Sequence, residues 1–172
     1  MKKLLMAFAV FCSASVLHAE ADYYAMASLW APGQIPMSSS SVIYGVRGTV
    51  FYGDCSRLNG LDLAIGANRA RESFNGLAIA GVFNRANNAA GVQLGFANMV
   101  ENEFSGLQAG VWNHAGHGYG VQLGGVNTAG YFAGLQLGIF NWADDLDGLQ
   151  LGLVNVIADQ SLYVLPFLNI GF

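Results

Sequence analysis

Few residues in this chain have the type and spacing for chemistry, and the clearest candidates are two histidines and a run of aspartates. His114 and His117 stand three residues apart and would supply two ligands of a zinc site if a third ligand approached. Asp144, Asp145 and Asp147 offer oxygen ligands for calcium, but the glycine and closing glutamate of an EF-hand loop are absent. Both segments are interpreted as hydrated turns, so no metal site and no cofactor is predicted.

Nucleophilic catalysis has equally little support in the sequence. A barrel enzyme such as a lipase would need a serine, a histidine and an acid in one set, and neither candidate histidine lies in a serine-containing motif. Cys55 sits in the turn-like segment Gly53-Asp54-Cys55-Ser56, with no residue beside it that predicts a catalytic role. The sequence therefore predicts a protein that is not an enzyme, with no catalytic residues.

The first 21 residues have the pattern of a secretory signal. Lys2 and Lys3 form a positive segment, residues 4–11 are apolar, and small residues follow up to Ala21. The apolar run is shorter than the roughly 20 residues of a spanning helix. Phe11 precedes Cys12, where a lipid-anchor signal would need a small residue. We expect cleavage after Ala21, with Ala19 as the alternative, which leaves residues 22–172 as one exported domain.

The composition limits the classes of partner. The chain is 53% hydrophobic and 10% charged, and its lysines are confined to positions 2 and 3. Since nucleic-acid binders neutralise phosphates with Lys and Arg, the sequence predicts no nucleic-acid partner. It also has no polybasic face for anionic headgroups. A charged fraction this far below the usual quarter indicates that something other than water faces part of the surface.

A repeated phrase of 14–16 residues dominates the chain from 60 to 155. Each copy opens on Gly-aliphatic and runs on through a second small residue to an asparagine. One structural unit is therefore copied seven times. The opening glycines are Gly60, Gly76, Gly91, Gly106, Gly120, Gly134 and Gly148, and the asparagines are Asn68, Asn84, Asn98, Asn113, Asn127, Asn141 and Asn155.

Within a copy, apolar and polar residues alternate with a period of two. In the last copy Leu149 and Leu151 fall on one face of an extended strand, and Gly148 and Gln150 fall on the other. Two glycines in eight residues argue against a helix. The pattern also extends backwards, because residues such as Phe104 precede an opening glycine by two positions. We expect strands of about 10 residues joined by turns of about four.

Three further segments have strand character. Residues 23–30 and 42–52 precede the repeats and are separated by a Pro- and Ser-rich loop at 32–41, and residues 162–172 follow them. With the seven copies this predicts ten strands, and eight is the alternative.

The pattern favours a small closed antiparallel up-and-down transmembrane β-barrel in the outer membrane of a Gram-negative bacterium. Its leucine face would meet lipid and its polar face would line the interior. Both termini would be periplasmic. Arg47 and Asp62, inward on adjacent strands, are expected to pair. Side chains would fill most of the lumen, which leaves room for a narrow channel at most. The predicted interior lining is Arg47, Thr49, Asp62, Gln93, Gln108, Gln122, Gln136 and Gln150.

The C-terminal residues resemble the closing-strand signal of bacterial outer-membrane barrels. Val164, Leu168, Ile170 and Phe172 repeat an apolar phase, which Pro166 interrupts. The resemblance implies recognition by the barrel-assembly machinery, and Pro166 predicts a bulge or weakened pairing.

The repeated phrase is similar to the Gly-Leu-Gln-aliphatic-Gly-aliphatic-aliphatic-Asn repeat of a family of bacterial surface-repeat proteins. The similarity covers Gly60 to Asn155, and all seven copies carry the framing glycine and asparagine. It implies a surface or outer-membrane location and no particular activity.

Nearly equal connections on both sides of the strands favour a different fold, because barrels have long external loops and short periplasmic turns. The alternative is a parallel β-solenoid that buries the leucine face and places Asn and Gly at its corners. A coil of 14 residues is short for three sides, and other sandwiches remain open.

The barrel interpretation predicts a non-enzymatic structural or surface-interaction protein whose partner is outer-membrane lipid. The solenoid interpretation predicts a secreted or surface-exposed protein that binds a partner along its regular face.

Overall fold

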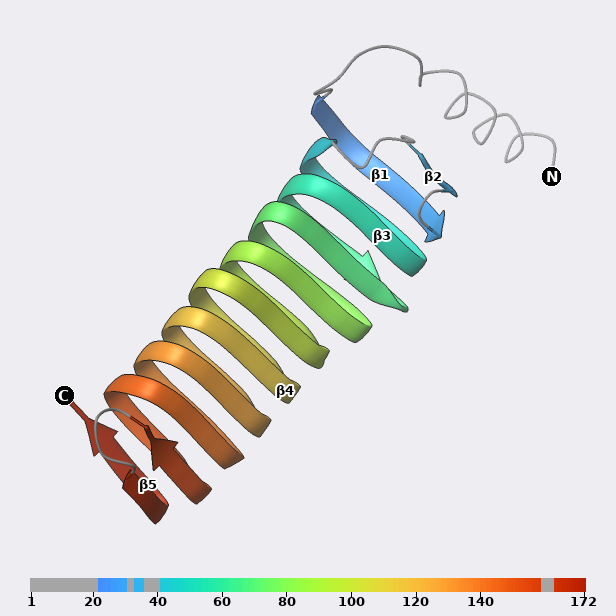
Figure 1. Cartoon of the computed structure of the whole chain (residues 1–172). Helices are drawn as coiled ribbons and strands as arrows, with labels where there is room; N and C mark the ends of the chain where they lie inside the picture. Colours follow the sequence, from blue (N-terminus) through green and yellow to red (C-terminus); the bar gives the residue numbers. More distant parts are fainter. Residues whose placement is uncertain (1–21, 31–32, 36–40, 159–162) are drawn as a thin grey trace, which may run out of the picture.

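A computed structural model of the chain describes residues 22–30, 33–35, 41–158 and 163–172 as one stack of β-coils (Figure 1). Its strands are β1 (Asp22–Trp30), β2 (Gly33–Ile35), β3 (Val42–Ala64), β4 (Ala67–Ile157) and β5 (Tyr163–Gly171). β4 is 91 residues long and winds through successive coils. The predicted signal at 1–21 and residues 32 and 36–40 of the predicted loop lie outside the described residues.

The strands pair in parallel along the stack, which rules out the predicted barrel. β1 pairs with β3 and β3 with β4, both parallel, and Gly60 lies beside Gly76 in the latter pair. The order β2-β1-β3-β4-β5 leaves β2 and β5 at opposite edges, so the sheet never closes. The closed antiparallel barrel and its ten hairpin-linked strands are wrong, and the alternative of a parallel β-solenoid is correct.

Each repeat is a complete coil with a corner at its opening glycine, not a strand with a hairpin turn, because the chain returns on the other side of the coil and then pairs in parallel with the next repeat (Figure 1). These glycines have φ from 123° at Gly91 to 152° at Gly148, a region that side chains disfavour, and Gly45 adds an eighth corner. They also allow close stacking, since a Cβ on Gly134 would lie 2.1 Å from the carbonyl oxygen of Gly120. A unit of 14–16 residues therefore returns to its starting side one layer further on.

The coil interior contains two columns of apolar side chains. One column, two residues before each corner glycine, combines large and small residues, and a Cβ on Gly118 would lie 2.5 Å from the ring of Phe132. The second column is mostly alanine, which keeps the coil narrow. The columns are Ile43, Leu58, Phe74, Ala89, Phe104, Gly118, Phe132 and Leu146, and Cys55, Ala70, Ala86, Val100, Ala115, Ala129, Ala143 and Ile157.

The leucine face points outward, opposite to the solenoid predicted from the sequence. Phe104 and Gln108 are each separated from Gly106 by two residues, so they share one parity of the alternation, and both are fully buried. Leu107 has the other parity and faces out. The prediction that a solenoid would bury its leucines is wrong because the aromatic column and the glutamines occupy the same side of the chain.

The C-terminal strand covers the last coil. β5 pairs antiparallel with the end of β4, and Leu168 lies beside Leu151. The register shifts between Gly152 and Asn155, opposite the segment containing Pro166, and Phe167 has a φ of 68°. The bulge expected from Pro166 is therefore present.

Replacing a corner glycine should destabilise the stack. Gly134→Ala places a side chain at a φ of 138° and against the Gly120 carbonyl, and we expect it to lower the free energy of unfolding by more than about 2 kcal/mol. Gly48→Ala is the matched control, because a Cβ there has no neighbour within 4 Å. Urea unfolding followed by circular dichroism compares the two. Equal midpoints would contradict the corner role of Gly134.

Candidate functional site

The predicted lining glutamines lie inside the coil and bond to one another along the stack. Each side-chain amide donates from Nε2 to the Oε1 of the previous coil, at 2.8 Å from Gln122 to Gln108 and 2.7 Å from Gln136 to Gln122. The ladder begins at Gln93, ends at Gln150, and is fully buried. Asn169 of β5 extends it by donating to Gln150 Oε1 at 3.5 Å.

The second hydrogen of each Nε2 crosses the coil. It donates to a backbone carbonyl six residues later, at His114, Thr128, Trp142 and Val156 for successive glutamines, with distances of 3.1–3.4 Å. Both donors of each of these amides are therefore used within the protein. The arrangement links the two sides of a coil and the coils to one another. It leaves these four glutamines no hydrogen to offer a solute, so these contacts support no channel.

An ion pair starts the same column. Arg47 donates from Nε and Nη2 to the two carboxylate oxygens of Asp62, at 2.8 and 2.5 Å, and from Nη1 to the carbonyl of Arg69 at 3.1 Å. Both side chains are buried, and the pairing was predicted from the sequence. Burial raises the pKa of Asp62, and the guanidinium of Arg47 opposes that shift. Ala78 occupies the equivalent position in the coil after Asp62. The column therefore has no polar side chain between the ion pair and the glutamine ladder.

A second ladder was missed at the level of sequence. The framing asparagines are buried and donate from Nδ2 to the Oδ1 of the next coil, at 2.8 Å from Asn113 to Asn127 and 2.7 Å from Asn141 to Asn155. The other hydrogen bonds a carbonyl of the next coil, such as Leu137 for Asn127. The fixed place of Asn in every copy was the available signal, but the solenoid alternative assigned it to the corners.

The first turn of this second ladder is incomplete. The position below Asn68 is Gly53, which has no side chain, and Oδ1 of Asn68 has no partner. The predicted lining residue Thr49 is buried there, with its Oγ1 close to where a Cβ of Gly53 would lie and also without a partner. The asparagine ladder therefore begins at Asn68, in the same coil where the asparagine pattern begins in the sequence.

The outward side after each corner carries the strongest candidate for a functional surface. Three positions per coil point outward there, none of them carries a polar side chain, and together they are called the aliphatic face. Its most exposed members are Ile65 at 77%, Ile139 at 62% and Phe96 at 61%. The face comprises Val46, Gly48, Val50, Leu61, Leu63, Ile65, Leu77, Ile79, Gly81, Val92, Leu94, Phe96, Leu107, Ala109, Val111, Val121, Leu123, Gly125, Leu135, Leu137, Ile139, Leu149, Leu151 and Leu153.

The aliphatic face is larger than the apolar patches of most monomeric proteins. Eight coils at about 4.8 Å and five residues at about 3.3 Å give a surface of about 38 by 17 Å, or about 650 Å². The largest patch on a typical monomer is about 300–600 Å² and is often functional. β5 prolongs the face, since Leu168 lies beside Leu151 and Ile170 beside Leu149, and both are exposed.

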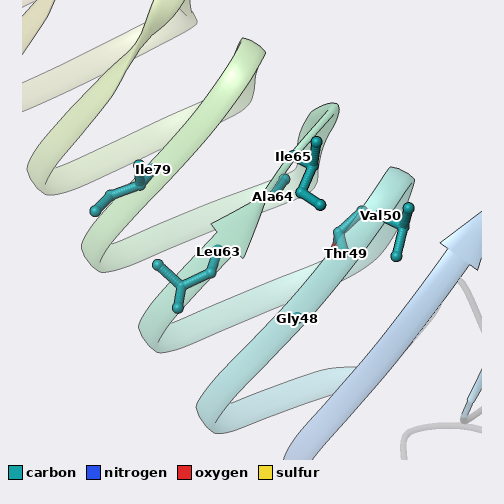
Figure 2. Close-up of a pocket in the computed structure, with 7 residues that line it drawn as sticks. All are labelled: Gly48, Thr49, Val50, Leu63, Ala64, Ile65 and Ile79. Atoms are coloured by element: carbon teal, nitrogen blue, oxygen red, sulfur yellow. The ribbon is translucent and has the colours of Figure 1, made fainter.

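The aliphatic face contains a hollow near its N-terminal end. Figure 2 shows Leu63 and Ile79 on one side of it and Val50 and Ile65 on the other, with Gly48 contributing no side chain. Its volume is about 430 Å³ and its lining is almost wholly apolar. The face therefore offers both a regular aliphatic sheet and one deeper recess.

Three further ion pairs of the described residues lie on the other side of the coil. Arg57 pairs with Glu72 at 3.1 Å and Arg85 with Glu101 at 2.9 Å, both partly exposed. Arg71 also pairs with Asp54. These pairs run along the stack between consecutive coils. They leave the aliphatic face uncharged and make the solenoid two-sided.

The residues first considered for metal binding have other contacts. His114 Nδ1 lies 3.0 Å from Thr128 Oγ1, and the ring of His117 lies 6.4 Å from that of Tyr131. Asp144 accepts a hydrogen bond from Trp142 Nε1 at 2.8 Å. Among the described residues, no three His, Cys, Asp or Glu side chains are grouped to hold a metal ion.

The predicted assembly-signal residues are all exposed. Val164, Leu168 and Ile170 are about half exposed on β5, and Phe172 is fully exposed after it. Their exposure places them where another molecule can reach them. Recognition by the assembly machinery remains a prediction.

Comparison of the chain with known proteins gives no match. No protein-family model matches it, and neither a curated protein nor a solved structure matches it. The described part of the chain contains no helix of the length and apolarity that crossing a bilayer requires. The geometry of the coil and its aliphatic face is therefore the basis for assigning a function.

Breaking the glutamine ladder should destabilise the protein. Gln122→Leu keeps the side-chain size but leaves Gln136 Nε2 without its acceptor and Gln108 Oε1 without its donor. At about 1–3 kcal/mol for each of the two orphaned groups, we expect a loss of about 2–6 kcal/mol. The neighbouring reverse change, Leu123→Gln on the outward side, should cost less than about 1 kcal/mol. Urea denaturation measures both, and equal losses would contradict the structural role of the ladder.

Cys55 should be chemically inert in the folded protein. Burial raises its pKa from 9.0 to about 11, which lowers the thiolate fraction near pH 8 by about 100-fold before steric protection is counted. In a Cys12→Ser background, iodoacetamide should alkylate Cys55 at least about 100-fold more slowly in the native protein than in guanidinium. Mass spectrometry gives both rates. Comparable alkylation rates in the native and unfolded protein would show that the coil around Cys55 unfolds locally and would contradict the prediction.

Proposed function

We propose that this chain is an exported, non-enzymatic β-solenoid repeat protein that works by docking a partner on its aliphatic face. The single observation that carries the proposal is an outward face of about 650 Å² without a polar side chain on an internally bonded coil. Parallel sheets are normally covered on both faces, because their backbones are flanked by apolar side chains. Here the inner face of the sheet is covered by the protein's own side chains, and the outer aliphatic face is free to bind a partner.

The interior supports a scaffold role. The amide ladders and the Arg47–Asp62 pair use their donors within the coil and present none to an outside substrate. Such ladders hold the outward side chains at a fixed spacing. The proposal therefore assigns binding to the outside and rigidity to the inside.

Export rests on the sequence of residues 1–21, and the outer-membrane location stays a prediction from that segment and from the repeat. The assembly signal at Val164, Leu168, Ile170 and Phe172 also stays a prediction. The proposed docking function requires only that the aliphatic face meets its partner after export.

Cysteine accessibility in cells tests whether the face is covered. In a Cys12→Ser background, Ile139→Cys on the face and Asn102→Cys on the charged side both introduce thiols at exposed positions. N-ethylmaleimide labelling in intact cells is compared with labelling of the same protein unfolded. We expect Asn102→Cys to label nearly fully and Ile139→Cys to reach at most about a tenth of its unfolded extent, because a partner shields it.

Cys55 is buried in the folded protein but becomes reactive in the unfolded reference, so labelling is read at position 139 or 102 alone by peptide mass spectrometry. Equal labelling of the two positions in cells would show that the face is bare and would overturn the proposed function.

A further inference from the structure

The aliphatic face lacks the groups that a protein partner normally uses. Protein interfaces carry about one hydrogen bond per 100–200 Å², so a face of about 650 Å² would be expected to provide several. None of its 24 positions has a polar side chain, and the backbone beneath it is paired from coil to coil, as between Leu61 and Leu77. Acyl chains need no hydrogen-bonding groups. The face therefore suits a hydrocarbon surface better than a protein surface.

The relief of the face points the same way. A second copy packed face to face would bury about 1,300 Å² in total, which is enough for a stable dimer. However, a second copy would have to place a matching side chain in the hollow of about 430 Å³ over Gly48 and Ala64. Unfilled apolar volume is costly in a rigid interface. Fluid acyl chains adapt to such a recess without a matching projection.

Aromatic residues border the face at both edges, and all but Phe51 carry a polar N–H or O–H group. Trp112 follows Val111 at one edge and Phe51 follows Val50 at the same edge, and both are about half exposed. Tyr44 and Tyr119 stand directly before corner glycines at the other edge, with similar exposure. Trp and Tyr are enriched where hydrocarbon meets headgroups, because their rings are apolar and their N–H or O–H groups remain polar.

The charges fit a neutral headgroup layer. The ion pairs Arg57–Glu72 and Arg85–Glu101 lie away from the aliphatic face, and the chain has a net charge of −4. A protein held by anionic lipid would need clustered basic residues beside its apolar face. The pairing of these arginines with acids argues instead for attachment through apolar contact alone.

We propose that the aliphatic face docks on the acyl-chain surface of a zwitterionic lipid bilayer, so that the solenoid lies flat with Trp112 and Tyr119 at the headgroup level. This inference rests on the proposed function, because it names the partner of the same face. The charged side of the coil then faces water. Interfacial proteins of this kind bury one apolar face to the depth of the headgroup–acyl boundary.

Flotation with phosphatidylcholine vesicles tests the lipid assignment with the full-length protein. The face variant Ile65→Glu/Ile139→Glu changes two of the most exposed aliphatic side chains, so folding is preserved. The control Asn87→Glu/Asn102→Glu adds the same two charges at exposed positions on the charged side. Both variants keep residues 1–21, so any vesicle binding through that segment is equal, and far-ultraviolet circular dichroism checks the fold of each.

We expect the wild-type protein and the control to float with the vesicles and the face variant to lose at least about tenfold in partitioning. Binding should be unchanged between about 0.1 and about 0.5 M NaCl, since apolar contact is not screened. Flotation of the face variant at the wild-type level would overturn the proposal. So would binding that requires anionic lipid or disappears with salt.

Two other results would overturn the lipid assignment. One of them would leave the proposed docking function intact, and the other would reject it. A wild-type protein that does not float but sediments as a dimer, with the face variant monomeric, would identify a second copy as the partner and leave docking through the face intact. A wild-type protein that neither floats nor dimerises would reject lipid, and free labelling of Ile139→Cys in cells would then reject docking as well.

Discussion

The hydrogen-bonded stacking of identical side chains is the constraint on which this structure depends. A buried amide is costly unless both its donor and acceptor capacity are used. Gln122 meets that requirement only because Gln108 and Gln136 lie one coil away on either side, at 2.8 and 2.7 Å. Repetition in the sequence is thus a condition for burying these groups, and the coil cannot be shortened to one unit without orphaning them.

The filled interior determines what the outside can be. Because Phe, Gln, Asn and Ala side chains occupy every inward column, the leucines that alternate with the glutamines must point out. A corner glycine such as Gly134 lets each layer approach its neighbour closely enough for the ladders to form. The result is a rigid coil with one uncharged aliphatic side and one side of ion pairs, which suits binding more than catalysis.

The sequence predicted individual local interactions, but it did not predict which side chains point into the coil and which point out. The pairing of Arg47 with Asp62 follows from their inward phase on adjacent strands, and the bulge beside Pro166 follows from its missing donor. The asparagine ladder escaped notice because a regular spacing of Asn is equally compatible with corners. The outward leucines were assigned to lipid within a barrel, and the same face was assigned to a core within a solenoid.

The sequence by itself determined an all-β repeat with period-two alternation, a unit of 14–16 residues and two chemically different faces. Only the tertiary structure decided whether each unit is a strand followed by a hairpin or a full coil, because alternation describes the faces of a strand and carries no information about its neighbour's direction. Gly91 and its equivalents have positive φ at their corners, and the chain then returns on the other side of the coil and not beside itself. That path makes the stack parallel and open, and the filled interior leaves the leucines on the outside.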